Sequence, residues 1–132
     1  MSEISTVIAA NPLYPEQLSE NIDIVRCGQL YGSSFALLLA VLATRQQGLL
    51  LAVVPDSQTA LSLQAELDFF LRGNGLSTLV FPDWETLPYD VLSPHQDIVS
   101  QRLATLYRLP AQRQGILIVP VATLLQRLAP RT

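Results

Sequence analysis

The amino-acid sequence predicts an α/β fold in which an open, mostly parallel sheet of four strands, or slightly more, is flanked by helices. Short apolar segments rich in β-branched residues alternate four times with segments whose apolar residues recur at helical spacing. The chain has 132 residues, 49% of them hydrophobic and 14% charged, so it is long and apolar enough to bury the core of one domain.

Two strands and the helix between them are predicted in the first half of the sequence. Residues 22–27 (IDIVRC) have the composition of a strand. Residues 35–47 predict a helix that is apolar on nearly every face and is therefore buried on most sides. Residues 49–54 (LLLAVV), which Pro55 follows, have the pattern of an interior parallel strand covered on both faces.

The next unit begins with a helix that Asp56 or Ser57 can cap. Its apolar positions recur at helical spacing until Gly73, and residues 78–81 (TLVF) follow as the third strand. Residues 82–94 contain three prolines, so we expect a loop there. The apolar positions of the helix are Ala60, Leu63, Leu67, Phe70 and Leu71.

The last unit starts at Asp97, which can cap a helix that Pro110 ends. One apolar stripe along this helix is expected to face the core. Residues 115–119 (GILIV) predict the fourth strand, and Pro120 begins a final helix over residues 121–128. The stripe consists of Ile98, Val99, Arg102, Leu103, Leu106 and Tyr107.

Charge divides the chain into two unlike parts. Residues 1–97 hold all eleven carboxylates and three arginines, whereas residues 98–132 hold five arginines and no carboxylate, and lysine is missing throughout. The basic part indicates either contact with nucleic acid or pairing with acidic surfaces of the same protein. The candidate nucleic-acid ligands are Arg102, Arg108, Arg113 and Arg127.

The composition argues against a membrane protein and against a secreted one. The longest apolar run, Phe35 to Ala43, is about half of the roughly 20 residues that a transmembrane helix needs. The first 25 residues contain neither lysine nor arginine, so we expect no secretory signal. A single cysteine, Cys27, allows no internal disulfide, and we expect a cytoplasmic protein.

The segment from Gly28 to Ser34 lies between a predicted strand and a predicted helix, where a P-loop would bind phosphate. A P-loop requires Gly-Lys-Ser/Thr, and this sequence has Gly32-Ser33-Ser34 with no lysine to reach the β- and γ-phosphates. We interpret Gly28 and Gly32 as turn residues and Ser33 or Ser34 as a helix cap, with a weak anion site as the alternative. No cofactor is expected.

The titratable residues form no catalytic or metal-binding pattern. Asp56, Asp83 and Glu85 follow strands, where open sheets bind ligands and a Mg²⁺ ligand would lie, but we expect Asp56 to cap a helix and the other two to be solvated. His95 has no second histidine and no nearby cysteine with which to bind a metal. Ser93 lies two residues before it, which is no specific triad pattern.

The segment over residues 83–90 (DWETLPYD) combines aromatic residues with a proline. Tryptophan and tyrosine are frequent at binding hot spots, so this region is a candidate interaction surface. The favoured interpretation, however, is that the only tryptophan, Trp84, packs under the loop as part of the core. The candidate surface consists of Trp84, Glu85, Tyr89, His95 and Arg102.

Three segments give the sequence a specific resemblance to a known family. Residues 83–90, 93–107 (SPHQDIVSQRLATLY) and 115–127 (GILIVPVATLLQR) closely resemble the N-terminal region of the bacterial transcription-repair coupling factors, the Mfd family. Residues 22–130 fit that region and, more distantly, the first domain of the excision-repair protein UvrB. The resemblance implies part of a degenerate RecA-like domain of the P-loop type.

The same resemblance implies how the chain is divided. Residues 1–21 form an N-terminal segment with a short predicted helix at 14–20, and residues 22–132 form a UvrB-like α/β domain, the first part of a larger N-terminal module. In UvrB the position of residues 28–34 carries a true P-loop, which implies that the nucleotide site is lost here. Residues 53–67 are similar to the strand and helix that carry motif Ia of helicase-type ATPases.

The family releases RNA polymerase stalled at DNA lesions by ATP-driven translocation and recruits UvrA for nucleotide excision repair. The motor and the polymerase-binding domain lie outside this stretch, and most of the UvrA-binding surface is expected beyond Thr132. The resemblance therefore implies a non-catalytic interaction and autoregulatory module, with UvrA and the other domains of the parent protein as partners. The alternative is a free-standing α/β protein that binds a phosphorylated ligand at residues 28–34.

Overall fold

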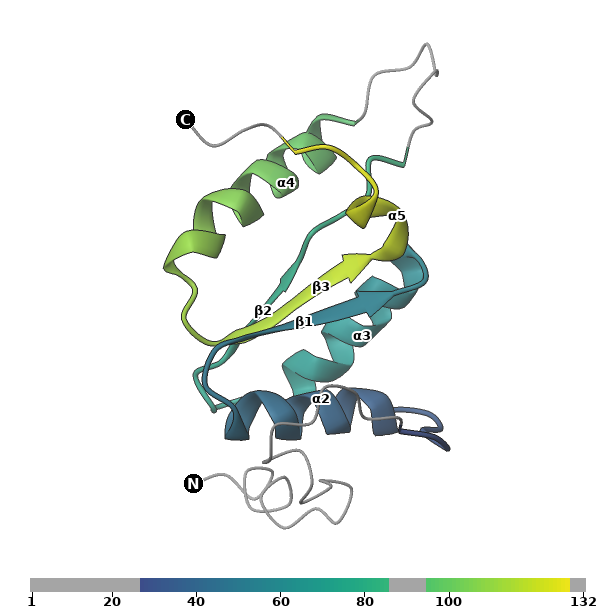
Figure 1. Cartoon of the computed structure of the whole chain (residues 1–132), viewed down its shortest axis with the longest axis vertical. Helices are drawn as coiled ribbons and strands as arrows, with labels where there is room; N and C mark the ends of the chain where they lie inside the picture. The colour runs from purple at the N-terminus through teal and green to yellow at the C-terminus, as the bar shows by residue number, and fades with distance from the viewer. Residues whose placement is uncertain (1–26, 86–94, 129–132) are drawn as a thin grey trace.

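The computed structural model describes residues 27–85 and 95–128 of the chain. Their centre is a parallel sheet of three strands, β1 (Leu49–Val54), β2 (Ser77–Val80) and β3 (Gly115–Pro120), in the order β1-β3-β2 (Figure 1). Gly115 of β3 aligns with Leu49 on one side and Ser77 on the other. The predicted open parallel α/β fold is confirmed. Of the further predicted strand at residues 22–27, only Cys27 is described, and it belongs to no strand.

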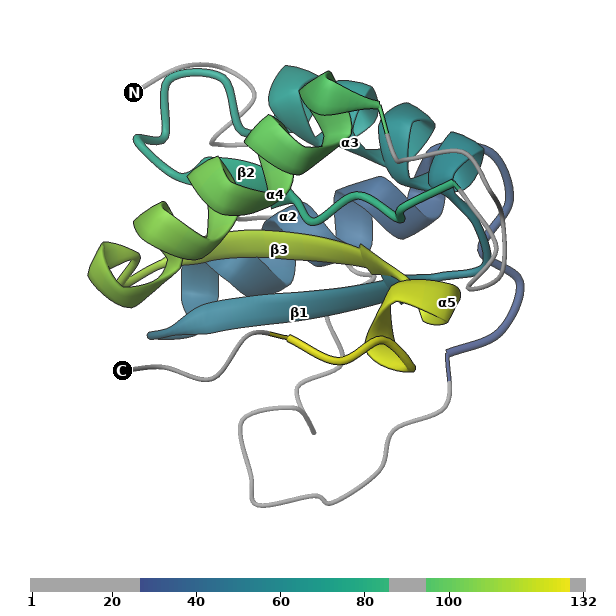
Figure 2. The ribbon, with the colours of Figure 1, turned by 90° about the horizontal axis from the view of Figure 1, so that it is seen from above.

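Helices lie on both faces of this sheet. Helices α2 (Ser34–Arg45) and α3 (Ser57–Phe70) cover one face, and α4 (Gln96–Arg108) and the single turn α5 (Val121–Leu124) lie on the opposite side (Figures 1 and 2). A 3-10 turn, η2 (Leu109–Ala111), follows α4 directly. None of the helices in the described ranges is long and apolar enough to cross a membrane.

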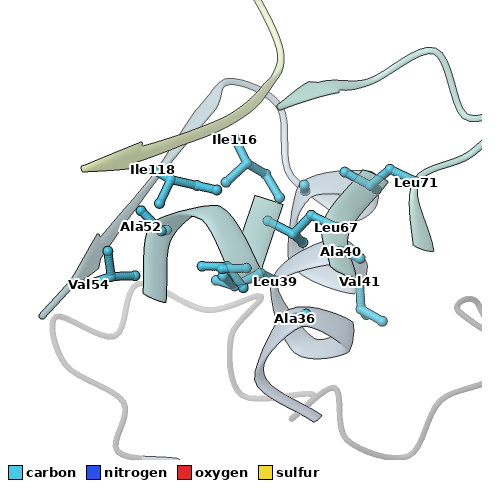
Figure 3. Packing of buried hydrophobic residues seen from close by; sticks show 13 residues of the cluster. Ala36, Leu39, Ala40, Val41, Ala52, Val54, Leu67, Leu71, Ile116 and Ile118 are labelled. Atoms are coloured by element: carbon cyan, nitrogen blue, oxygen red, sulfur yellow. The ribbon is translucent and has the colours of Figure 1, made fainter. Parts of the chain in front are cut away.

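The hydrophobic core fills the layer between the sheet and helices α2 and α3. Strands β1 and β3 point alternate side chains into it, and Figure 3 shows them meeting residues of the two helices. Fully buried side chains are central to the free energy of folding, at about 1.5–3 kcal/mol for a large aliphatic residue. Members of this core include Ala36, Leu39, Ala40, Val41, Ala52, Leu67, Ile116 and Ile118.

Helix α2 confirms the prediction from its apolar composition. Six of its twelve residues are buried, among them Leu38 and Leu39 on neighbouring positions, and Phe35 remains 38% exposed. Small residues at Ala36 and Ala40 are completely buried, which allows the helix to approach its neighbours closely. The predicted apolar positions of α3 also face the core, since Ala60, Leu63, Leu67 and Leu71 are buried and Phe70 is partly buried.

Strand β1 differs from its prediction. Its sequence indicates an interior strand, but within the described residues β1 lies at an edge of the sheet and β3 is central. Ala52 and Val54 are 3% exposed, whereas Leu51 and Val53, which point to the other face, are 54% and 45% exposed. The strand is apolar on both faces, and the described helices cover only one of them.

The prediction for α4 was wrong in three respects. The helix is capped by His95 rather than Asp97, because the His95 side chain accepts the Asp97 backbone N–H at 3.3 Å. Leu103 and Tyr107, expected in the core stripe, are 61% and 87% exposed. The buried positions of the helix are polar, and they lie on the side that meets the edge of β2. The final helix is also shorter than predicted, since α5 ends at Leu124.

Candidate functional site

The turn before α2 is the first candidate site from the sequence. Ser34 donates its backbone N–H to Tyr31 O at 3.1 Å, and Gly32 between them has φ +55°, a conformation that favours glycine. The tight turn expected at Gly32 is confirmed, whereas Gly28 does not adopt a positive φ. Ser33 occupies the N-cap position, but its side chain makes no capping hydrogen bond.

The chemistry of this turn is that of an ordinary helix start. Residues 27–44 contain neither lysine nor arginine, so no cationic side chain of the loop or of the helix up to Thr44 can reach a phosphate. The backbone N–H groups at the start of α2 are the remaining anion ligands, and exposed groups of this kind bind phosphate weakly without a cation.

The carboxylate after β1 is used by the helix that follows. Asp56 accepts the backbone N–H of Thr59 at 2.7 Å and is the N-cap of α3, as predicted. The pKa of Asp56 is lowered from its ordinary value of 3.8, first by the Thr59 backbone hydrogen bond. One carboxylate oxygen is therefore committed to the helix cap rather than to a metal ion.

The segment after β2 forms a cluster around a buried arginine, the Arg102 cluster, which comprises Phe81, Pro82, Asp83, Trp84 and Arg102. The Arg102 guanidinium carbon lies 4.3 Å from the ring centroid of Phe81 and 4.1 Å from that of Trp84. One guanidinium N–H donates to Pro82 O at 2.5 Å. Arg102 is 3% exposed, so this predicted member of an interaction surface is enclosed by the protein itself.

Asp83 adds a negative charge to the Arg102 cluster. Burial lowers the pKa of Arg102, and the negative charge of Asp83 opposes that shift. Asp83 also accepts the Trp84 backbone N–H at 2.8 Å and a side-chain N–H of Gln126, which follows α5. The expectation of a solvated Asp83 was therefore wrong. The cluster joins the ends of β2 and β3 to α4 at the edge of the sheet where open α/β proteins bind ligands.

Two side chains of α4 also donate hydrogen bonds to backbone carbonyls at the outer edge of β2. Phe81 N–H donates to Ile118 O of β3, so Val80 and Pro82, its neighbours in the chain, point their carbonyls away from the sheet. The Thr105 hydroxyl donates to Val80 O at 3.1 Å and to Gln101 O of its own helix at 2.9 Å, and Arg102 donates to Pro82 O. These two residues lie three positions apart on α4, which places them on one face of the helix.

Beside this edge lies a groove of about 460 Å³ between α3 and α4. Thr78 and Val80 line it from β2, Gln64 from α3 and Arg108 from α4. Glu85, with a φ of +57°, lies at its rim. Ser57, Thr78 and Thr105 bring hydroxyl groups to its lining, and Thr105 is hydrogen-bonded to Val80 O and Gln101 O.

His95 has a structural role at the start of α4. Its Nδ1 accepts the Asp97 backbone N–H and lies 3.3 Å from the Asp97 carboxylate, and the ring is exposed. Ser93 and Tyr89, the other predicted residues of this region, lie outside the described residues. Within the described ranges no three His, Cys, Asp or Glu side chains gather closely enough to hold a metal ion.

The arginines proposed for nucleic acid do not form a common surface with Arg102. Arg108, Arg113 and Arg127 are exposed, and they lie on α4, after η2 and after α5 respectively. Arg102 is enclosed between two aromatic rings. Thr105 and Gln126 were not predicted as polar partners from the sequence. The one signal was the position of Arg102 inside an apolar stripe, which indicates a buried polar contact.

Comparison with protein-family models gave no match. Curated relatives do match: the transcription-repair-coupling factor of Escherichia coli K12 is 48% identical over 105 residues, which are 80% of this chain and 9% of that protein. The factor of Haemophilus influenzae is 39% identical over 78% of this chain, and that of Mycobacterium bovis 38% over 77%. The chain spans about 9% of the length of each of these relatives. It is therefore homologous, over about four-fifths of its length, to a segment of the transcription-repair-coupling factors.

Proposed function

We propose that this chain is a non-catalytic module of a transcription-repair coupling factor, in which it serves as a structural, interaction and autoregulatory element. The parent protein would release RNA polymerase stalled at DNA lesions in an ATP-dependent way and recruit UvrA for nucleotide excision repair. The identity of 48% to a factor of that name supports this assignment. Its place of action would be the cytoplasm.

The single observation that carries the non-catalytic role is the turn from Gly28 to Ser34. The turn has the position of a P-loop between a predicted strand and α2, but Ser33 stands where the phosphate-binding lysine belongs. Phosphoryl transfer depends mainly on electrostatic stabilisation of the transferred group, and this turn supplies backbone dipoles without a cation. That difference supports the proposed loss of nucleotide binding.

The ends of the strands support the same conclusion. Asp56 caps α3, and Asp83 is engaged by Trp84 N–H, Gln126 and the charge of Arg102. A magnesium ion would need carboxylate oxygens that point into an open site. In this chain the corresponding groups stabilise helix and loop geometry instead.

The proposed partners of the module are UvrA and the other domains of the parent protein. UvrA would bind mainly through sequence beyond residue 132, and RNA polymerase and DNA through other domains of the parent. The described residues expose large apolar side chains on both sides of the sheet, Leu51 and Leu61 among them. Such surfaces suit contacts with neighbouring domains.

A nucleotide titration tests the loss of the site. We expect no saturable binding of ATP with magnesium up to millimolar concentration, measured by calorimetry, and no hydrolysis. Saturable binding without hydrolysis would favour the alternative, a domain that holds a phosphorylated ligand at Gly28 to Ser34. Turnover of ATP would contradict both assignments.

A pull-down against UvrA tests the assignment to transcription-coupled repair. The chain and a longer form of the same protein are compared as bait at equal concentration. We expect the longer form to retain UvrA and the 132-residue chain to retain little. Equal retention would place the UvrA surface within this chain, and no retention by either form would contradict the proposed partner.

A further inference from the structure

The outer edge of β2 is an open edge of the described sheet. Strand β2 pairs with β3 on one side only and stands last in the strand order β1-β3-β2 (Figure 1). Phe81 donates its N–H to Ile118 O and therefore faces β3. Backbone direction alternates along a strand, so Thr78, Val80 and Pro82 direct their backbone groups away from β3. The groove between α3 and α4 runs along this edge, and β2 forms part of its lining.

Helix α4 satisfies only part of this edge. Arg102 donates to Pro82 O, and the Thr105 hydroxyl donates to Val80 O, so both contacts go to carbonyl groups. Among the described residues, nothing pairs with Thr78 N–H, Thr78 O or Val80 N–H. The Thr78 hydroxyl beside them is buried and also has no hydrogen-bond partner within the described ranges. The edge therefore offers two backbone donors and one backbone acceptor beside the groove, which is the pattern that another strand can pair with.

The volume of the groove favours an extended occupant over a helix. One turn of helix, a cylinder about 10 Å wide and about 5.4 Å high, fills about 420 Å³. The groove of about 460 Å³ thus has room for little more than one turn, and a helix would leave the backbone groups of the edge unpaired. An extended residue takes about 160 Å³, from a rise of about 3.3 Å and spacings of about 4.8 Å between strands and about 10 Å between sheets. About three extended residues therefore fit, which is the length of the segment from Thr78 to Val80.

An exposed arginine of α4 lies beside the unpaired part of the edge. Arg102, Thr105 and Arg108 follow one another at three-residue spacing along one face of α4. The first binds Pro82 O and the second Val80 O, so this row of side chains runs back along β2. Arg108, the third, therefore lies toward the start of β2. It lines the groove, is exposed, and forms no ion pair with a described carboxylate.

The two charged residues of the groove lining differ in sign. Glu85 follows β2 and so lies toward the other end of the groove from Arg108. A carboxylate of the occupant is therefore favoured beside Arg108 and disfavoured beside Glu85. Side chains of an added strand point alternately to its two faces, here toward α4 and toward α3. On α3 the wall includes Ala60 and the exposed Leu61, so apolar residues that alternate with the acidic ones complete the fit.

We propose that the outer edge of β2 accepts an extended segment of another polypeptide as an added strand, in which apolar residues alternate with acidic ones. This inference deepens the proposed function and rests on it, since it names a surface through which the module would make an interaction. Strand addition gives affinity through main-chain hydrogen bonds and specificity through alternate side chains. The edge strands of a second copy do not fit, because neither β1 nor β2 contains a carboxylate for Arg108.

The test uses the complete 132-residue chain and a labelled peptide of about ten residues in which valine and glutamate alternate, with binding followed by fluorescence anisotropy. We expect saturable binding. The same peptide with N-methylated backbone amides keeps its side chains but donates no main-chain hydrogen bond, so it should not bind measurably. A matched peptide with lysine in place of glutamate should bind about fivefold more weakly or worse, because the lysines meet Arg108.

Substitutions in the chain locate the binding edge. Arg108→Glu should reverse the preference, so that the lysine peptide binds more tightly than the glutamate peptide. Arg113→Glu is the matched control, since Arg113 is exposed but does not line the groove. Thr78→Pro removes an outward N–H, which proline can do on an edge strand, and should weaken binding about tenfold, whereas Thr78→Val keeps that N–H and should not. Fluorescence of Trp84 and circular dichroism check that each variant is folded.

Several outcomes would overturn the proposal. These are no binding of the glutamate peptide, equal binding of the N-methylated peptide, or a preference for glutamate that Arg108→Glu leaves unchanged. A dimer of the chain that Thr78→Pro dissociates would identify a second copy as the occupant and would also overturn it. Peptide binding without capture of UvrA by the longer form would contradict the proposed function alone, whereas capture without peptide binding would contradict only the strand addition.

Discussion

Arg102 is the residue whose role differs most from its place in the sequence pattern. It lies in a stripe of apolar residues, and its guanidinium is stacked between the rings of Phe81 and Trp84. The planar guanidinium contacts two aromatic rings while one of its N–H groups donates to Pro82 O. The residue therefore stabilises the loop after β2 instead of presenting a charge to a partner.

Replacement of Arg102 by methionine tests this role. We expect Arg102→Met to lower the free energy of unfolding by about 2–4 kcal/mol, because a charged hydrogen bond and two cation–π contacts are lost. Urea unfolding followed by the fluorescence of the only tryptophan, Trp84, measures the change. Arg108→Met on the exposed side of the same helix is the control, and equal effects of the two substitutions would contradict the role.

Asp56 makes stability depend on pH. The folded-state pKa of this carboxyl is below its ordinary value of 3.8, so its contribution is present above pH 3.8 and is lost as the pH falls through the lower folded-state pKa. Asp56→Asn keeps a good capping residue that does not titrate. We expect the urea midpoint of the natural chain, relative to that of Asp56→Asn, to fall on acidification below 3.8. Parallel curves for the two proteins would contradict the expectation.

At the scale of elements, the position of α4 explains why its apolar stripe gave a wrong prediction of its buried face. An apolar stripe is normally read as a face against a core, but α4 meets the edge of a strand, where carbonyl groups need donors. Thr105 and Arg102 supply those donors, while Leu103 and Tyr107 are left on the exposed side. The position of a helix over an edge or over a face is not encoded in its periodicity.

Gly115 of β3 has no room for a Cβ beside the backbone of β2. It has φ +130°, and a Cβ placed on it would lie 2.4 Å from Ser77 O, a backbone atom. We expect Gly115→Ala to destabilise the protein more than Gly73→Ala, which has φ +83° but open space around the Cβ position. The control should cost about 1–2 kcal/mol from its backbone conformation alone. Thermal unfolding of both variants measures the difference, and equal midpoints would show that the close approach is relieved without cost.

At the scale of the whole molecule, the two faces of the sheet are unequally covered. Helices α2 and α3 bury one face, and on the other face Leu51 and Val53 of β1 remain exposed. The arginines of residues 98–128 are spread over several elements: Arg102 is buried, Arg108 lines the groove between α3 and α4, Arg113 follows η2 and Arg127 follows α5. The charge division of the sequence therefore does not correspond to a single surface of the described residues.

The lost nucleotide site gives a prediction for the molecule as a whole. Ser33→Lys returns a cation to the turn before α2, yet Asp56 and Asp83 remain engaged in a helix cap and in the Arg102 cluster. We therefore expect no ATP hydrolysis by this variant in a phosphate-release assay with magnesium. Measurable turnover would mean that the carboxylates needed for the metal are available after all.

The sequence by itself determined the alternation of strands and helices, the buried helix α2, the cap at Asp56 and the missing lysine of the turn. Each of these depends on neighbouring residues, so local composition and spacing were sufficient to predict it. The sheet order, the edge position of β1 and the buried role of Arg102 were decided by the tertiary structure. They depend on which elements meet in space, and Arg102 lies 20 residues from the carbonyl that it binds. Periodicity specifies that a side chain is apolar or polar, but not which distant group will cover or pair with it.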